Sequence, residues 1–462
     1  MVDVNRTNHF EINNLTLVSY ANGKEMNITK MWDDIEIFED MYTNCLSGNI
    51  TLIDSLNLIY HFSICGREKL IITFKTPYFD TLYGDTAITR TFRVYKISER
   101  APTENDKAIR YILHFVSEEF VKSQQVKISK SYSGRVDEMV KKVYDEYLKI
   151  DYGNKKSNKE LNASKTLYKH KFIIPFWSPL STINWLTARA VDAENKENCN
   201  FIFYEDLEGF KFKSFAELGK EKPVAEYEYF PQTRPLEDGS TSPRDLAKEH
   251  STIREFLMME YHNTMKNTEN GFFASRLMFH DIVRKQWGCV DYTYNEDFFN
   301  ADHIEKNPLV AAGNDNLSQN HLANFKFYPK HKGMFGTEPS CIDNDKCQEW
   351  VLKRNAQMQQ IEGSKLNFTL PGNSMLRIGQ VVKIVIPSFE QVENPFVDWM
   401  DKYMSGKYII SAIRHNIQLN KGYVMRLELS RDSLPTALPD TKVFGSSKFP
   451  TQGDFFSQTV KA

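Results

Sequence analysis

The chain lacks the sequence features that mark several common protein classes. Its amino terminus carries no apolar segment, so no secretory signal peptide is expected. No run approaches the ~18 apolar residues of a membrane span. The six cysteines among 462 residues are scattered and form no Cys-x-x-Cys pair, which favours free thiols in a reducing compartment. We therefore expect a soluble protein that is made in a cytoplasm and has no membrane span.

A dominant charge and the common catalytic motifs are also missing. There are 58 basic and 60 acidic side chains, with a net charge of -2, so no global basic field points to nucleic acid, although local patches stay possible. No His-Glu-x-x-His, Gly-x-Ser-x-Gly, phosphate-binding Gly-rich loop or Gly-x-Gly-x-x-Gly occurs. These absences lower the expectation of an enzyme. We predict no catalytic, cofactor-binding or metal-binding residues.

A few acidic and histidine pairs could carry chemistry, and each has a plainer interpretation. We interpret Glu118-Glu119 and Asp33-Asp34 as solvated carboxylates, because neighbours in a strand point to opposite faces and do not share one site. His280-Asp281 is reminiscent of metal phosphohydrolases, but it lies inside an alternating segment. A structural histidine in a strand is therefore the favoured interpretation.

The segment after residue 340 offers further weak candidates. Asp343 and Asp345 with Glu349 suggest calcium, yet the glycine and the full ligand spacing of an EF-hand are missing, so a solvated loop is favoured. Cys341 and Cys347 lack partner ligands at zinc spacing and are expected to be unpaired thiols. Trp350 is assigned to the core rather than to an interface. An exposed Phe455-Phe456 pair on a polar tail is of the kind that docks on a partner.

The chain is rich in aromatic residues, with 32 Phe and 22 Tyr, and contains short segments in which apolar and polar residues alternate. Both favour β-strands. Residues 1–120 contain such segments separated by Gly, Asn and Pro, which predicts a first small antiparallel barrel or sandwich. Residues 346–435 contain a second cluster. It ends in a hairpin that turns at 420–422.

The region between the two strand clusters has a mixed pattern. In 121–215 we predict a helix at 136–148 opened by Ser131 or Ser133, a loop at 151–165, a helix that starts at Ser178-Pro179 and carries Ile183, Leu186, Ala190 and Val191, and a hairpin that turns at 206–209. In 216–345 we predict a connector at 231–244, strands near 253–261 and 271–294, and an irregular polar segment from 300 to 345. A helix is expected at 347–359, and residues 436–462 are expected to form an extended tail.

The two strand clusters repeat the same order of elements. The first contains 70–77, which ends in proline, then 94–97, then the aromatic-led segment 111–115. The second contains 381–387, which also ends in proline, then 410–413, then 423–427. This order favours two related barrels split by an insertion, although unrelated β-domains can share such a pattern.

Seven stretches carry a resemblance to a known family: 35–54, 64–74, 204–212, 271–275, 370–374, 379–382 and 406–433. Taken in order, they resemble the baseplate hub proteins of contractile-tailed phages, which are related to the hub part of type VI secretion spike proteins. None is a strict fingerprint, and the ordered set carries the resemblance. It covers most of residues 30–435 and leaves out 300–345 and the tail.

The resemblance implies a mainly β fold with an α+β insertion, in which one chain holds two tail-tube-like antiparallel β-barrels. The corresponding divisions are 1–120 for the first barrel, 121–215 for the mixed insertion, 216–345 for the rest of the insertion and the start of the second barrel, 346–435 for the second barrel, and 436–462 for the tail. A homotrimer of tandem barrels would present six similar modules with true threefold symmetry.

The function implied is structural: a trimeric hub in the virion tail baseplate, which joins the hexameric tail tube to the threefold spike around a central channel. The implied partners are the chain itself, the tail spike protein, the tail tube protein, other baseplate proteins, and tape-measure protein or DNA in the channel. The channel face is expected to avoid basic clusters, so that DNA can slide. Two alternatives stay open, a virion-associated hydrolase of cell-wall or surface polysaccharide and a carbohydrate-binding receptor-recognition module.

Overall fold

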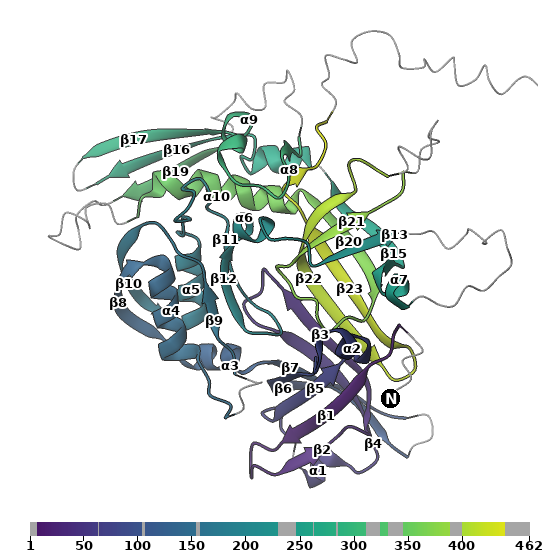
Figure 1. Ribbon diagram of the computed structural model, residues 1–462. Helices are drawn as coiled ribbons and strands as arrows, with labels where there is room; N and C mark the ends of the chain where they lie inside the picture. The colour runs from purple at the N-terminus through teal and green to yellow at the C-terminus, as the bar shows by residue number, and fades with distance from the viewer. Residues whose placement is uncertain are drawn as a thin grey trace, which may run out of the picture.

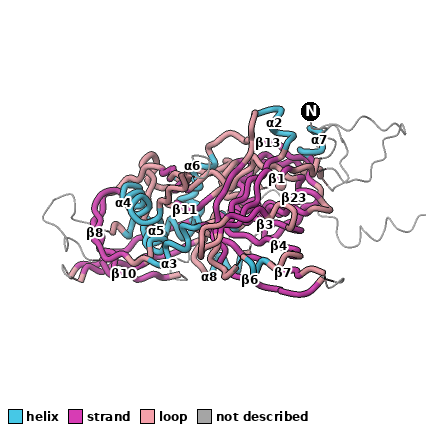
Figure 2. Tube along the Cα trace, turned by 90° about the horizontal axis from the view of Figure 1, so that it is seen from below, coloured by secondary structure: helices cyan, strands magenta, loops and turns pink. Residues whose placement is uncertain are grey.

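The protein is mainly β, and its strands gather in one large sheet (Figure 1). The computed structural model describes residues 7–62, 64–103, 107–153, 158–229, 246–261, 263–282, 285–310, 324–330, 345–388 and 400–438. Within these residues, fourteen strands from the two ends of the chain join in the large sheet, and the other strands form small sheets of two or three. Helices α4 and α5 lie with β8 and β10 at one end of the molecule, and the strands of the large sheet lie toward the other (Figure 2).

The first seven strands form what we call the N-terminal module. They are β1 (Glu11–Val18), β2 (Glu25–Asn27), β3 (Trp32–Asp40), β4 (Ser47–Asp54), β5 (Lys69–Lys75), β6 (Ile88–Pro102) and β7 (Ile109–Ser117), with the short helices α1 (Leu58–His61) and α2 (Pro77–Tyr83). Their hydrogen-bonded order is β2-β1-β5-β6-β7-β4-β3. The two ends of this path, β2 and β3, are separated along the chain only by residues 28–31.

Seven later strands form the C-terminal module. They are β13 (Ala225–Tyr229), β14 (Thr252–Ile253), β15 (Glu255–Tyr261), β20 (Ser364–Pro371), β21 (Val381–Val385), β22 (Gly406–Gln418) and β23 (Gly422–Ser430). Their order is β14-β13-β21-β22-β23-β20-β15, and only Arg254 separates the ends β14 and β15. The expectation of a purely antiparallel module is wrong at β13, which pairs in parallel with both β14 and β21.

A mixed α+β region follows the N-terminal module and packs beside it. Its elements are α3 (Glu118–Gln125), β8 (Ile128–Arg135), α4 (Val136–Val143), the π-helical turn η1 (Tyr144–Leu148), β9 (Leu161–Ala163), β10 (Lys169–Trp177), α5 (Pro179–Thr187), β11 (Phe201–Glu205), β12 (Phe210–Ser214) and α6 (Phe215–Gly219). We call it the inserted region. A core of its own, which includes Met139, Val140, Ile183 and Phe212, holds it together.

A third layer lies above the C-terminal module in the view of Figure 1. It contains α8 (Thr264–Glu269), β16 (Ala274–Asp281), β17 (Gln286–Thr293), α9 (Tyr294–Asp297), η2 (Phe298–Asn300), β18 (Asn307–Pro308), β19 (Phe325–Lys330), α10 (Cys347–Glu362) and β24 (Ser433–Leu434). Helix α7 (Leu246–Ser251) lies instead beside the C-terminal module, against β13 and β20. Strands β16, β17 and β19 form one small sheet, and β18 pairs with β24. Helix α10 packs on this sheet through a cluster that includes Leu277 and Leu352.

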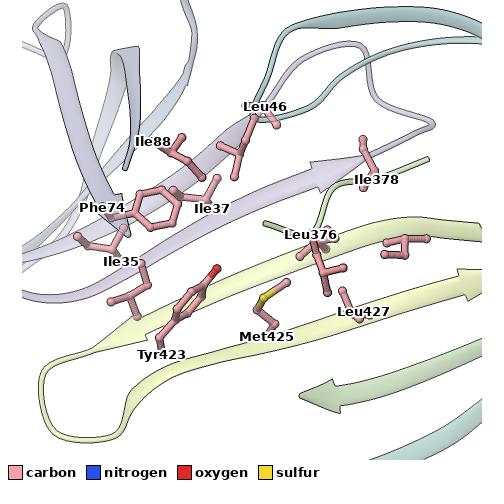
Figure 3. Close-up of a cluster of buried hydrophobic side chains, with 14 of the residues drawn as sticks. Ile35, Ile37, Leu46, Phe74, Ile88, Leu376, Ile378, Tyr423, Met425 and Leu427 are labelled. Atoms are coloured by element: carbon pink, nitrogen blue, oxygen red, sulfur yellow. The ribbon is translucent and has the colours of Figure 1, made fainter. Parts of the chain in front are cut away.

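One apolar core runs through both strand modules, so they do not fold around separate centres. Ile35 and Ile37 on β3 and Phe74 on β5 belong to the same buried cluster as Tyr423 and Met425 on β23 (Figure 3). Burying a large apolar side chain contributes about 1.5–3 kcal/mol. The strands from the two ends of the chain therefore stabilise each other directly.

Four local predictions from the sequence are wrong. Ser131 and Ser133 do not open the helix, because they lie in β8, paired with β10. Helix α4 begins instead after Arg135, whose N–H is satisfied by the side chain of Glu138 at 3.1 Å. The loop at 151–165 contains β9, and α5 ends before Ala190 and Val191, which are buried all the same.

The fourth error concerns the irregular segment at 300–345. It contains β19, which adds in parallel to β16. A strand added in parallel from a distance has no hairpin turn to reveal it in the sequence. The connector 231–244 lies outside the described residues, and so does the tail from residue 439 onward. The predicted cap at Ser178 is confirmed: its Oγ accepts from the N–H of Ser181 at 3.3 Å.

Candidate assembly surface

The two strand modules repeat one order of strand pairing, except that β13 is parallel to its two neighbours whereas its counterpart β1 is antiparallel to both. In the N-terminal module, β6 and β7 form a hairpin, β6 also pairs with β5, and β7 also pairs with β4. In the C-terminal module, β22 and β23 form a hairpin, β22 also pairs with β21, and β23 also pairs with β20. The corresponding strands are β1 and β13, β2–β3 and β14–β15, β4 and β20, β5 and β21, β6 and β22, and β7 and β23. The repeated order of elements in the sequence matched β5 to β21, β6 to β22 and β7 to β23 as counterparts. The strand order in the structure gives the same counterparts.

Single hydrogen bonds and irregularities recur at equivalent positions. Val94 N–H donates to Glu68 O at 2.9 Å, and its counterpart Ile410 N–H donates to Gln380 O at 3.0 Å. Both hairpins contain a β-bulge at the next residue, Tyr95 in β6 and Ser411 in β22. Bulges bend strands at defined places. Their recurrence allows residue-by-residue comparison of the modules.

The modules are joined within the chain by a ladder between β22 and β3. It runs antiparallel from Ala412↔Asp40 to Gln418↔Asp34. Its buried side contains a polar network: His415 Nε2 lies 2.6 Å from Glu39 Oε1, and His415 Nδ1 lies 2.7 Å from the Tyr423 hydroxyl. Glu39 also accepts from the N–H of Leu207 at 3.3 Å. Burial raises the pKa of Tyr423, so its hydroxyl keeps its proton.

This junction makes a continuous sheet of eight strands, in the order β6-β7-β4-β3-β22-β23-β20-β15. Its outer face has paired charges of both signs. Arg414 pairs with Glu36 across the junction, and Lys365 Nζ lies 3.2 Å from Glu428 Oε1. A groove of about 690 Å³ follows this face at the junction and is lined by residues of β3, β15, β20, β22 and β23.

The two ends of the eight-stranded sheet, β6 and β15, are exposed. In the described residues, β6 from Lys96 to Pro102 pairs only with β7, and β15 pairs only with β20. On β15, the side chains of Leu257 and Met259 are 61% and 55% exposed. Unpaired strand edges with apolar side chains invite pairing with another chain. These two edges are the candidate functional site.

A second buried polar cluster ties the inserted region to the N-terminal module. Lys159 Nζ lies 2.7 Å from Glu119 Oε2 and 2.6 Å from Glu205 Oε1, and all three side chains are at most 1% exposed. Glu205 also accepts from the N–H of Leu46 at 3.0 Å. Burial raises the pKa of Glu119, and Lys159 opposes that rise. We call this the lysine-centred cluster.

The interpretation of Glu118-Glu119 as solvated carboxylates in a strand is therefore wrong. Both residues lie in helix α3, and Glu119 is buried against Lys159. Glu118 pairs with Arg93 on β6. The helix begins directly after β7, and a helix of eight residues leaves too short a pattern to be recognised beside a strand. The cluster itself was missed because its members are 40 or more residues apart.

The remaining residues proposed from the sequence do not form a common site. His280 and Asp281 lie in β16, as expected. Asp345 pairs with Arg189 at 3.2 Å, and the indole N–H of Trp350 donates to the carbonyl of Asp345 at 3.0 Å. Cys347 is buried, and its Sγ lies 3.8 Å from Gln348 Oε1. Residues 341, 343, 455 and 456 lie outside the described residues.

The part of the chain that the structure describes has neither a cluster of metal-binding side chains nor a helix that could span a membrane. No group of three or more His, Cys, Asp or Glu side chains there could hold a metal ion. Every described helix is too short or too polar to cross a lipid bilayer. The polar clusters that do occur, around Glu39 and around Lys159, join structural elements to one another.

Sequence comparison connects this architecture to phage tails. The chain is 22% identical over 427 residues to the probable baseplate hub protein gp334 of Vibrio phage KVP40, a match that covers 90% of this chain and 92% of that protein. No family model matches the chain. This relative confirms the resemblance to baseplate hub proteins and the expected location in the virion tail baseplate.

A solved structure supports the fold. The tail protein from Neisseria meningitidis MC58 is 10% identical and aligns with a TM-score of 0.50 over 92% of this chain and 99% of its own. A component of the Escherichia coli type VI secretion system, also 10% identical, aligns with a TM-score of 0.42 over 94% of this chain and 79% of its own. The chain thus has the fold of a phage tail protein and is similar in sequence to a baseplate hub.

Proposed function

We propose that this protein is the structural hub of a phage tail baseplate. Three copies form a ring of six strand modules, which joins a sixfold tail tube to a threefold spike around a central channel. The observation that carries the proposal is the repeat of one order of strand pairing in the two modules, together with the β3–β22 ladder that sets them side by side. A chain with two such modules matches sixfold and threefold symmetry at once.

The continuity of each module supports the idea of two barrels. Around the N-terminal module, the ladder path ends at β2 and β3, which residues 28–31 connect. Around the C-terminal module, it ends at β14 and β15, which Arg254 connects. Each path then returns to its start through the chain itself, as in a small barrel made with one bent strand.

The outer face of the eight-stranded sheet is the proposed channel wall. It carries charges of both signs, with pairs such as Arg414 with Glu36 and Lys365 with Glu428, so it lacks a one-sided basic field. A DNA-binding face would gather Lys and Arg to neutralise phosphates. A wall of mixed charge suits the passage of DNA or an extended protein without tight binding.

The proposed role is assembly and not catalysis. The hydrolase alternative predicts that the purified protein releases products from peptidoglycan or surface polysaccharide, and the receptor-binding alternative predicts glycan binding. Zymography and a glycan array test these two directly. The hub proposal predicts neither activity, and clear hydrolysis at substoichiometric protein would overturn its non-enzymatic part.

Light scattering of the full chain, alone and with the spike protein of the same virus, tests the oligomer. The proposal predicts three copies of the 53.8 kDa chain per particle, either alone or in a complex that also contains the mass of the spike. Electron microscopy of that particle should show an open ring with sixfold-like modules and threefold symmetry. A chain that stays monomeric in both samples, or forms a symmetric dimer, would contradict the proposal.

A further inference from the structure

We propose that neighbouring copies are joined by an antiparallel β-ladder between β6 of one copy, residues 97–102, and β15 of the next, residues 256–261. The inference rests on the proposed function and goes beyond it, because it assigns the interface to two named strands with a defined register. In that register Ile97 faces Tyr261 and Pro102 faces Phe256.

The template for this ladder is the junction inside each chain. There, β22 of the C-terminal module pairs with β3 of the N-terminal module. Strand β6 is the counterpart of β22, and β15 is the counterpart of β3, because each has the same partners in its own module. If the step that relates the two modules within a chain is repeated between chains, β6 meets β15.

The exposed residues of β6 lie where its counterpart β22 is covered by a neighbouring strand. Ser411, His415 and Ile417 on β22 are buried where β3 covers them. The counterpart of Ser411 in the N-terminal module is Tyr95, which is 55% exposed. The strand after it is exposed at Lys96 and again from 99 to 102. The same fold positions are thus covered in one module and open in the other.

The two open strands share a matching irregularity, which is the strongest argument for their pairing. Between the counterparts of Arg414 and Asn416, β6 has two residues, Glu99 and Arg100, where β22 has one. Between the counterparts of Phe38 and Glu36, β15 also has two residues where β3 has one. In the β3–β22 ladder Arg414 faces Phe38 and Asn416 faces Glu36, so both extra residues fall at the same step.

An extra residue on one strand alone would break a ladder copied from the junction. With one on each strand, the residues pair one to one: Ser98 with Glu260, Glu99 with Met259, Arg100 with Met258, and Ala101 with Leu257. Each strand therefore fits the other better than it would fit β3 or β22. This argues for a second copy of this chain as the occupant.

Side chains at the centre of this register are compatible. At the junction, Asn416 Nδ2 donates to Glu36 Oε1 at 3.2 Å across the strands. The equivalent pair between copies is Ala101 with Leu257, both exposed in the single chain. An apolar cross-strand pair stabilises two paired strands and is sheltered from water when they meet. A polar contact at the junction would thus be replaced by an apolar one between copies.

A disulfide tests the register. Directly opposite residues in an antiparallel pair have Cβ atoms about 4.5–5.5 Å apart, close enough for a disulfide with slight adjustment. We would place Ala101→Cys with Leu257→Cys in a background in which Cys65, Cys289 and Cys341 are serine, and oxidise the full chain with diamide. Within one chain the two positions lie at opposite ends of eight strands, roughly 34 Å apart at about 4.8 Å per strand, so they cannot bridge.

The expected result is two new bands on a non-reducing gel, a covalent dimer and a closed trimer. Both bands should disappear when dithiothreitol reduces the disulfide. The mismatched control, Lys96→Cys with Leu257→Cys, shifts the contact by five residues, about 17 Å, and should give less than a tenth of the cross-linked product. Equal cross-linking of the two pairs would overturn the register. Melting curves that match the parent protein establish that both variants are folded.

Light scattering on the same samples separates the two proposals. A trimer that does not cross-link through Ala101→Cys and Leu257→Cys overturns the strand pairing and leaves the hub proposal standing. A monomer, with and without the spike protein, that also fails to cross-link overturns both. Cross-linking to the spike protein instead of to a second copy would identify another occupant and refute the ladder.

Discussion

The junction between the two modules is held by a buried carboxylate, and Glu39→Ala should weaken the fold severely. Glu39 is 1% exposed and accepts from two groups, His415 Nε2 at 2.6 Å and the N–H of Leu207 at 3.3 Å. Alanine leaves both donors buried without an acceptor. Each unsatisfied buried donor costs about 1–3 kcal/mol, so the loss is about 4 kcal/mol in all.

A loss of this size is large beside the 5–15 kcal/mol that stabilises a typical domain. For a body of some 200 residues, 1 kcal/mol shifts the melting temperature by roughly 2–4 °C, so Glu39→Ala should lower it by roughly 8–16 °C. Differential scanning calorimetry, or urea unfolding followed by tryptophan fluorescence, measures the change. Trp32 at the start of β3 is buried and reports on this part of the sheet.

Two matched variants isolate the cause. Glu39→Gln keeps an oxygen acceptor in the same place and should cost less than half as much as Glu39→Ala. Glu36→Ala, on the same strand but on its outer face, removes the pair with Arg414, which is 41% exposed, and should cost about 1 kcal/mol or less. If the three variants melt alike, or if Glu39→Ala melts within 2 °C of the parent, the buried network does not hold the junction.

Other predictions follow from single contacts. Gly48→Ala should destabilise by about 1–3 kcal/mol in urea unfolding, because a Cβ there would lie 2.4 Å from a ring carbon of Phe115; parental stability would refute the packing. Lys159→Met should cost about 3–5 kcal/mol, since it leaves the two carboxylates of the lysine-centred cluster buried without a cation; unchanged melting would contradict this. Burial alone would lower the pKa of His303, but Asp432, 2.8 Å away, raises it overall. The stabilisation is then full below the ordinary pKa of about 6.5 and is lost as pH rises through the folded value, so the melting difference between parent and His303→Gln should shrink from pH 5.5 to 9. A melting difference that grows with pH would contradict the raised pKa of His303.

Local patterns predicted the elements that are long and strictly periodic. The terminal hairpin, the turn at 420–422 and the cap at Ser178 follow from neighbouring residues alone, and the structure places them as expected. The repeat of β5–β7 in β21–β23 was also visible, because a proline stop and an aromatic-led strand recur in order. Strands added from a distance, such as β9, β13 and β19, gave no such signal.

The bulge at Ser411 illustrates the limit of strict alternation. Every residue from Tyr408 to Ser411 is buried, whereas beyond the bulge only Ile413, His415 and Ile417 are, so the burial alternates on only one side of it. A one-residue insertion moves every later side chain to the other face. The sequence alone has no marker for that step, and only the paired strand reveals it.

By itself, the sequence determined a mainly β chain with two similar strand clusters, a mixed insertion and the likeness to baseplate hubs, because these depend on local periodicity and on the order of motifs. Tertiary structure alone decided that β22 pairs with β3, that His415 meets Glu39 and that Lys159 lies between two carboxylates. These contacts join residues 40 to 384 positions apart. The physical reason is that a ladder or a buried ion pair forms wherever the folded backbone brings its members together, and no local pattern encodes that distance.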